Sequence, residues 1–161
     1  SDLDMQPRII EFGAIKLNEN LEEIDRLSFL CNPGHPLDPV ITKITKIKDD
    51  MLIDQKPFIA HYQDLCSFFL GQETLCAHNL SFDRKILRFE LERMDKLTKF
   101  PWPPNHICTV EIGQSVWGKM RKLGEMYYDV TGKQHLKAHR SVEDVNATIE
   151  ILRWFREKSH I

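Results

Sequence analysis

The sequence lacks the features that mark a membrane-bound or a strongly charged protein. None of its apolar runs is long enough to span a bilayer, and no stretch has the composition of a secretory signal peptide. Its 22 Lys and Arg residues nearly balance 24 Asp and Glu residues, which gives a formal net charge of -2. A protein with this balance does not bind nucleic acid or anionic lipid through a general positive field. Any contact with nucleic acid must therefore be local, and we expect no membrane association.

The sequence is also poor in cysteine pairs. Cys31, Cys66, Cys76 and Cys108 are far apart, no C-x-x-C motif occurs, and each lies in an apolar neighbourhood. This distribution favours reduced thiols in the core over disulfides or a zinc cluster. We therefore expect a reducing, cytoplasmic setting.

No repeat, low-complexity tract or linker divides the chain, and 161 residues with 42% hydrophobic content suit one domain with a proper core. Periodicity and turn residues predict antiparallel strands first and then alternating helices and short strands. The expected strands are 8–17, 24–31, 74–77 and 106–108, and the expected helices are 49–52, 57–70, 81–93, 110–117, 123–130 and one from residue 141 onward. This order predicts an α/β fold with a mixed central sheet flanked by helices.

Two aspartates lie where predicted helices begin. Asp83 falls in the first turn after a predicted N-cap at Ser81, and Ser141-x-x-Asp144 resembles a capping box. Each has an ordinary structural explanation. Together they suggest a site, because ligands of open α/β sheets bind at the carboxyl ends of strands, and a carboxylate at a helix N-terminus stays ionised for a hard cation.

His139 lies five residues before Asp144, in the segment "GKQHLKAHRS", which is rich in cations. Its imidazole titrates near neutral pH, so it suits a general base beside a phosphodiester. His135 and His139 also have the H-x-x-x-H spacing of a zinc pair, although no second ligand pair with zinc spacing appears. Six basic residues form a candidate phosphate-binding patch, for which a solvated face is the alternative: Lys119, Arg121, Lys122, Lys133, Lys137 and Arg140.

With these motifs the chain resembles the DEDD superfamily of 3′→5′ exonucleases, in the branch with a catalytic histidine that includes the proofreading subunit of bacterial replicative DNA polymerase. "AHNLSFDRKIL" is similar to the second motif, H-N-x-x-F-D, and "AHRSVEDVNAT" to the third. "RIIEFGAI" resembles the second strand, and "ICTVEIGQSVW" and "KLGEMYYDVTGK" resemble the segments between the last two motifs. The resemblance implies the ribonuclease H-like exonuclease fold.

The resemblance also implies the roles of individual residues. His139 would be the general base, and Asp83 and Asp144 would be two of four acids that hold two Mg²⁺ or Mn²⁺ ions. Ile47 matches the apolar wedge beside the 3′-terminal base, although Thr45 and Lys46 replace the His and Gly frequent in relatives. His78, Asn79 and Phe82 are the other expected substrate contacts, with half-buried packing as the alternative use of Phe82.

The first family motif, D-x-E on the first strand, does not occur in the sequence. Asp2 and Asp4 are a conceivable D-x-D substitute, because alternate residues of a strand point the same way. In the family fold the first strand lies between the second and the fourth, so its absence would leave two sheet fragments with unpaired edges. We therefore expect that about ten or more residues upstream, or another segment, supply it. Residues 1–161 are then a single exonuclease domain that lacks its first strand.

The predicted function is metal-dependent 3′→5′ hydrolysis of nucleic acid to nucleoside 5′-monophosphates. The expected substrate is DNA with a free 3′ end, single-stranded DNA above all, and the expected partner is a polymerase. A catalytically inactive relative that binds nucleic acid or protein is one alternative. An exoribonuclease is another, because contacts to the sugar 2′ position cannot be placed from the sequence.

Overall fold

The structure is a computed structural model that describes residues 3–161. Its N-terminal part is the predicted hairpin, in which β1 (Glu11–Leu17) pairs antiparallel with β2 (Glu23–Leu30). The Asn18 side chain accepts hydrogen bonds from the backbone N–H groups of Asn20 and Glu22, which closes the turn. Asx turns of this kind are common between paired strands.

A second pair of strands is parallel. β3 (Thr74–Ala77) pairs with β4 (Asn105–Cys108), and α4 (Leu80–Arg93) connects them. Among the described residues the strands form two separate two-stranded sheets rather than one central sheet. The presence of a further strand between the two sheets stays a prediction.

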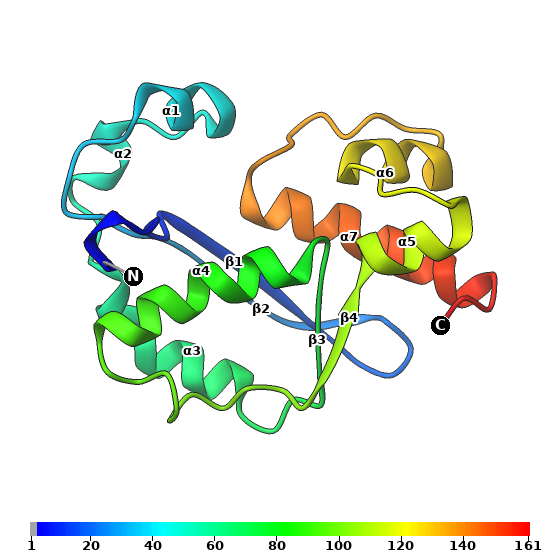
Figure 1. The fold of residues 1–161 in the computed structure, drawn as a ribbon, viewed down its shortest axis with the longest axis horizontal. Coiled ribbons are helices and arrows are strands. Elements are labelled where there is room, and N and C mark those ends of the chain that lie inside the picture. Colours follow the sequence, from blue (N-terminus) through cyan, green and yellow to red (C-terminus); the bar gives the residue numbers. More distant parts are fainter. Residues whose placement is uncertain (1–2) are drawn as a thin grey trace.

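Helices cover these sheets in two groups (Figure 1). α3 and α4 lie with the hairpin, while α5, α6 and α7 pack together, and α7 also contacts β1. The remaining bounds are η1 Leu3–Met5, α1 Pro39–Thr45, α2 Asp49–Leu52, η2 Phe58–His61, α3 Tyr62–Phe69, α5 Thr109–Trp117, α6 Leu123–Thr131 and α7 Ser141–Glu157. The sequence did not predict α1, because the surrounding prolines suggested a loop. The Asp38 side chain accepts from the Val40 N–H and Pro39 occupies the first turn, which are two ordinary helix-start signals.

Two hydrophobic clusters stabilise the two groups of helices. The first joins Cys31 of the hairpin end to Phe58, Leu65 and Leu91. Leu27 and Phe29 pack against it from β2, as their alternation predicted. The second contains Met126, Ile151 and Phe155, each with 0% exposure, and holds α6 and α7 together.

A buried carboxylate fixes the N-terminal segment to α4. Glu90 is 1% exposed, accepts a hydrogen bond of 2.8 Å from the Ile9 N–H, and forms ion pairs with Arg8 and Arg93. Arg93 in turn donates to the carbonyl oxygens of Leu3 and Gln6. Buried charges of this kind need such partners, because an unpaired one costs several kcal/mol.

The four cysteines are free thiols. Cys31 is buried, whereas Cys66, Cys76 and Cys108 are only partly buried. Burial raises the pKa of the Cys31 and Cys76 thiols to about 12. Within the described part of the chain, every helix is too short or too polar to cross a lipid bilayer.

Candidate active site

The second motif lies where β3 leads into α4. The helix begins at Leu80, and its N-cap is Asn79 in the left-handed conformation, with φ of 64°. The N-cap predicted at Ser81 is therefore wrong, because Asn adopts this conformation more readily than most residues and turns the chain two residues earlier. Asp83 lies in the first turn, as predicted.

His78 is held by the protein through both ring nitrogens. Its Nε2 lies 3.0 Å from the Arg121 carbonyl oxygen and its Nδ1 lies 2.9 Å from the Thr109 hydroxyl. A carbonyl can only accept, so Nε2 carries the proton and Nδ1 accepts from the hydroxyl. Burial lowers the pKa of His78, against smaller opposing effects of the Arg121 carbonyl and the Asp144 carboxylate. A neutral ring with both nitrogens engaged ties the end of β3 to the start of α5.

The Asp83 carboxyl has an unusual protonation equilibrium. Desolvation by the surrounding protein, together with the nearby Asp144 carboxylate, raises its pKa from 3.8 to about 6. The residue still keeps substantial solvent contact. The helix N-terminus was expected to favour the ionised form, but loss of solvation outweighs that effect. Asp83 thus remains mostly ionised at neutral pH with a narrow margin.

Asp144 lies at the start of α7 and receives three hydrogen bonds. Its Oδ1 is 2.6 Å from His135 Nε2, and both of its oxygens are 3.1 Å from the backbone N of His139. The predicted capping box is wrong. The N-cap is Arg140, so Ser141 lies inside the helix, where its buried Oγ has no hydrogen-bond partner.

The two histidines of the loop contact Asp144 in different ways. The ring of His135 contacts Asp144, and its side chain is 8% exposed. His139 is exposed and has φ of 69°, so its backbone rather than its ring binds Asp144. No three His, Cys, Asp or Glu side chains within residues 3–161 lie close enough to hold a metal, which leaves the zinc-pair alternative without a third ligand there.

The structure thus brings the second and third motifs to one place. Asp144 lies within electrostatic range of Asp83 and of His78, which come from a segment 60 residues away in the chain. Figure 1 shows the start of α4 beside the top of β3, near the middle of the molecule. The structure shows that Asp83, His78 and Asp144 lie near one another. The catalytic roles of these residues stay predictions.

The other expected substrate contacts differ widely in exposure. Ile47 is 1% exposed, so in this structure its side chain lies in the interior and its use as a wedge stays a prediction. Phe82 is 57% exposed, so a part of its surface is free to stack on a base, and its use in substrate binding stays a prediction. Asn79 is also exposed. Asp4 lies in the short helix η1 rather than on a strand, which removes the geometric basis of the D-x-D substitute, and Asp2 lies outside the described residues.

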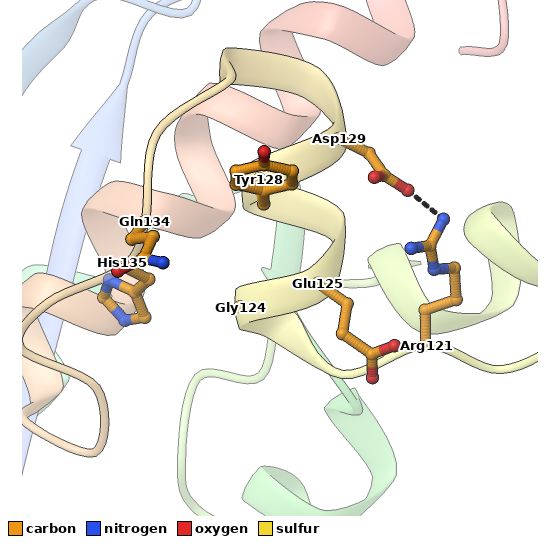
Figure 2. Close-up of a pocket in the computed structure, with 7 residues that line it drawn as sticks. All are labelled: Arg121, Gly124, Glu125, Tyr128, Asp129, Gln134 and His135. Atoms are coloured by element: carbon orange, nitrogen blue, oxygen red, sulfur yellow. Dashed lines mark ion pairs between the residues drawn. The ribbon is translucent and has the colours of Figure 1, made fainter.

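A pocket of about 490 Å³ lies between α6 and the loop that follows it, and one of its lining residues is His135, whose ring contacts Asp144. Figure 2 shows Arg121 paired with Asp129 on one side and Gln134 and His135 on the other. Arg121 is therefore neutralised, and Arg140 is likewise paired with Glu11. Two of the six members of the predicted basic patch are thus bound to carboxylates within the protein.

The donors present suit a hard divalent cation by type but not by number. Asp83 and Asp144 supply carboxylate oxygens, which Mg²⁺ and Mn²⁺ prefer. Within residues 3–161, however, a third ligand of this kind is absent, and each ion takes about six ligands. A complete two-ion site therefore needs donors beyond these two carboxylates.

The arrangement of two converging carboxylates and a histidine loop agrees with a sequence comparison. The profile of the RNase_T family, described as Exonuclease, matches residues 2–152. The chain belongs to this exonuclease family. The resemblance to DEDD exonucleases deduced from the motifs is thereby confirmed.

Curated relatives of this exonuclease-family chain are bacterial polymerases. It is 31% identical over 148 residues to DNA polymerase III PolC-type of Bacillus subtilis (strain 168), covering 89% of this chain and 10% of that protein. It is 30% identical over 155 residues to DNA polymerase III PolC-type of Clostridium perfringens (strain 13 / Type A), covering 94% and 10%. The chain thus spans about a tenth of the length of these relatives.

Two solved structures have the same fold. Exonuclease I aligns with a TM-score of 0.75 at 18% identity, over 92% of this chain and 37% of that one. Exonuclease X in complex with 5′ overhanging duplex DNA aligns with a TM-score of 0.66 at 21% identity, over 98% and 88%. At these identities the structures establish the ribonuclease H-like fold, as predicted.

Sequence reasoning missed two groups in this region. His135 was considered only as half of a zinc pair, because nothing in the sequence indicates that its ring reaches Asp144. Glu11 was treated as an ordinary strand residue, although an acid within the apolar run "RIIEFGAI" is the signal of a partner elsewhere.

Proposed function

We propose that this domain is a metal-dependent 3′→5′ exonuclease that hydrolyses DNA to nucleoside 5′-monophosphates. The observation that carries the proposal is the convergence of Asp83 and Asp144, two motif residues from different helices, within electrostatic range of each other. Desolvation, and to a smaller extent the Asp144 charge, raises the pKa of Asp83, and a bound cation would offset both effects by stabilising the ionised carboxylates.

Each residue has a distinct part in this proposal. Bound Mg²⁺ or Mn²⁺ ions supply charge neutralisation at the phosphate and acidify a water molecule. Asp83 and Asp144 hold the ions, and His139 accepts the proton of the attacking water. Its exposed ring and its position beside Asp144 support this role. Phe82, which is exposed close to Asp83 in the chain, offers a stacking surface for a base.

We further propose that an additional strand carrying the D-x-E acids completes the domain. The two separate two-stranded sheets and the shortage of cation ligands within residues 3–161 both support it. One strand inserted between the sheets would pair with an edge of each and bring two more carboxylates to Asp83 and Asp144. That strand would come from residues upstream or from another segment.

Similarity to PolC-type polymerases and to a DNA-bound exonuclease favours DNA as the substrate and a polymerase as the partner. Single-stranded DNA with a free 3′ end is the form that we propose the site accepts. A cytoplasmic setting stays a prediction based on the cysteine distribution.

The proposal is tested with the natural protein that contains these residues. The substrates are single-stranded DNA and RNA of one sequence, each labelled at the 5′ end, with Mg²⁺ or Mn²⁺ and with a chelator as control. We expect DNA to shorten from its 3′ end with release of 5′-monophosphates. His139→Ala and Asp144→Asn should each lower the rate by at least about 100-fold.

The same experiment separates the alternatives. Faster digestion of RNA would indicate an exoribonuclease. Binding of the oligonucleotide without release of mononucleotides in any metal would overturn the enzymatic proposal in favour of an inactive binding domain.

A further inference from the structure

Glu11, the first residue of β1, makes an extensive contact with the start of α7. Its carboxylate accepts from Arg140 Nε at 3.1 and 3.2 Å, from a terminal Arg140 nitrogen at 2.9 Å, and from the Ser141 backbone N at 2.9 Å. The Glu11 side chain is only 12% exposed. A single carboxylate thus joins a strand to two consecutive residues that lie about 130 positions further along the chain.

The chemistry of this contact makes it stronger than a surface ion pair. The guanidinium and the carboxylate bind in a two-pronged geometry, which adds directional specificity to the charge interaction. The Ser141 N–H belongs to the first turn of α7, where a negative charge is favoured by the helix dipole. Low exposure limits screening by solvent. Glu11 therefore stabilises one orientation of this helix start.

The contact lies immediately beside the proposed base. The His139 N–H is bound by Asp144, and the next two residues are bound by Glu11. His139 itself has φ of 69°, a left-handed conformation that is uncommon for residues other than glycine. Its backbone is thus fixed on both sides by carboxylates, one from α7 and one from β1.

β1 also meets α7 without space for a side chain. A Cβ atom on Gly13 would lie 2.6 Å from Ser141 Oγ and 3.1 Å from the Ser141 carbonyl carbon. The strand and the helix start are therefore in direct contact on both sides of Phe12, so the position of β1 determines that of residues 139–141.

We propose that Glu11 is a positioning residue of the nuclease site, which holds the His139 backbone in its left-handed conformation through Arg140 and Ser141. This inference rests on the proposed function for its catalytic consequence. In this proposal Glu11 contacts neither the substrate nor a cation. Loss of Glu11 would let the loop relax and would move His139 away from the attacking water, and misplacement by about 1 Å can cost on the order of 100-fold in rate.

The test compares Glu11→Ala, Glu11→Gln and Arg140→Ala in the natural protein, with Glu23→Ala as the matched control. Glu23 lies on β2 and forms an exposed ion pair with Arg26, so its removal reports the general effect of losing a strand acid. We expect Glu11→Ala to lower kcat by at least about 10-fold with KM changed less than threefold. Glu11→Gln, which keeps one acceptor oxygen, should fall between Glu11→Ala and the parent, and Glu23→Ala should stay within about twofold.

Hydrogen exchange supplies a readout that does not depend on activity. We expect Glu11→Ala to accelerate exchange of the amides of residues 136–141 by about 10-fold or more, while amides in the middle of α7 keep their protection. Glu11→Ala combined with Arg140→Ala should be no worse than Glu11→Ala alone, because Glu11→Ala already removes the contacts to both Arg140 and Ser141.

Three results would overturn the proposal: unchanged loop exchange in Glu11→Ala, an unchanged kcat in a variant whose loop has loosened, or equal acceleration throughout α7, which would indicate general destabilisation. If the parent protein has no nuclease activity, the proposed function fails. The exchange measurement still decides whether Glu11 holds the loop.

Discussion

The candidate site is shaped at the residue scale by two carboxyl groups in unlike surroundings. Asp144 receives hydrogen bonds from His135 and from the His139 backbone, whereas Asp83 is a solvent-exposed residue whose carboxyl group is partly desolvated by the surrounding protein and lies near the Asp144 charge. The resulting pKa of about 6 for Asp83 means that its ionisation at neutral pH works against folding. Such strain is typical of functional sites.

Asp83→Asn should therefore stabilise the metal-free protein above pH 6 while abolishing the proposed activity. Between pH 4 and 6 the folded protein holds a proton at Asp83 that the unfolded chain has released, so stability falls as the pH rises through this window. Asparagine does not ionise, so the variant does not lose this stability as the pH rises. Because solvent screens this exposed carboxylate, we expect a gain of only about 1 kcal/mol at pH 7.5.

Urea unfolding in the presence of a chelator measures this effect for Asp83→Asn and the parent protein. The two should have nearly equal stability at pH 4, where the parent carboxyl is mostly protonated. A variant less stable than the parent at pH 7.5 would contradict the assigned ionisation.

The sequence predicted the positions of the motif residues well but not their local contacts. Asp83 and Asp144 were placed correctly in first helical turns, because N-terminal helix signals are local in sequence. Ser81 and Ser141 were wrong as caps, since Asn79 and Arg140 occupy those positions through tertiary placement of the chain. The contacts of His135 and Glu11 depend on how the segment with the third motif packs against β1. Local sequence patterns do not predict such a tertiary contact.

At the scale of elements, α4 holds the second motif rigidly because its far end is fixed to the N-terminal segment. Glu90 makes that connection. In the sequence it looks like any other charged residue of this helix. The periodicity of "LSFDRKILRFELER" predicts the helix but does not tell Glu90 from the exposed Glu92. Packing against Arg8 and Ile9 decides which glutamate is buried.

Glu90→Ala should destabilise the protein by about 3 kcal/mol or more, because it leaves Arg8, Arg93 and the Ile9 N–H without their partner. Glu92→Ala in the same helix is the matched control, and its effect should stay within about 0.5 kcal/mol. Equilibrium urea unfolding of both variants at pH 7.5 is the measurement. Equal stabilities would show that the buried network contributes nothing beyond helix propensity.

The described part of the molecule contains two two-stranded sheets, which are joined where Leu75 of β3 packs into the hydrophobic cluster of the hairpin and where α7 contacts β1. The strands of the hairpin and the parallel pair were all predicted, because alternation and turn residues are strong signals for short strands. These local signals do not show whether the hairpin and the parallel pair form one sheet. That depends on whether another strand lies between the two pairs. The fold is thus recognisable, while the centre of the sheet is the part that an added strand would complete.

A synthetic peptide of about ten residues, apolar and carrying D-x-E, should therefore raise the thermal unfolding midpoint of residues 1–161. Pairing with the open edges would satisfy backbone groups that otherwise remain unpaired. The control peptide has one central proline, which removes a donor and cannot join a central strand. Thermal scans at increasing peptide concentration measure the shift, and identical midpoints with both peptides would contradict pairing between the sheets.

Open strand edges commonly lead to aggregation through strand pairing between molecules. The β2 strand of the hairpin carries charged residues that oppose such pairing. Residues Glu23, Asp25 and Arg26 place charges along the exposed half of β2. A second molecule that tried to extend the hairpin there would have to strip water from those charges. Association through this edge of β2 should for this reason be weaker than through an apolar edge of the same length.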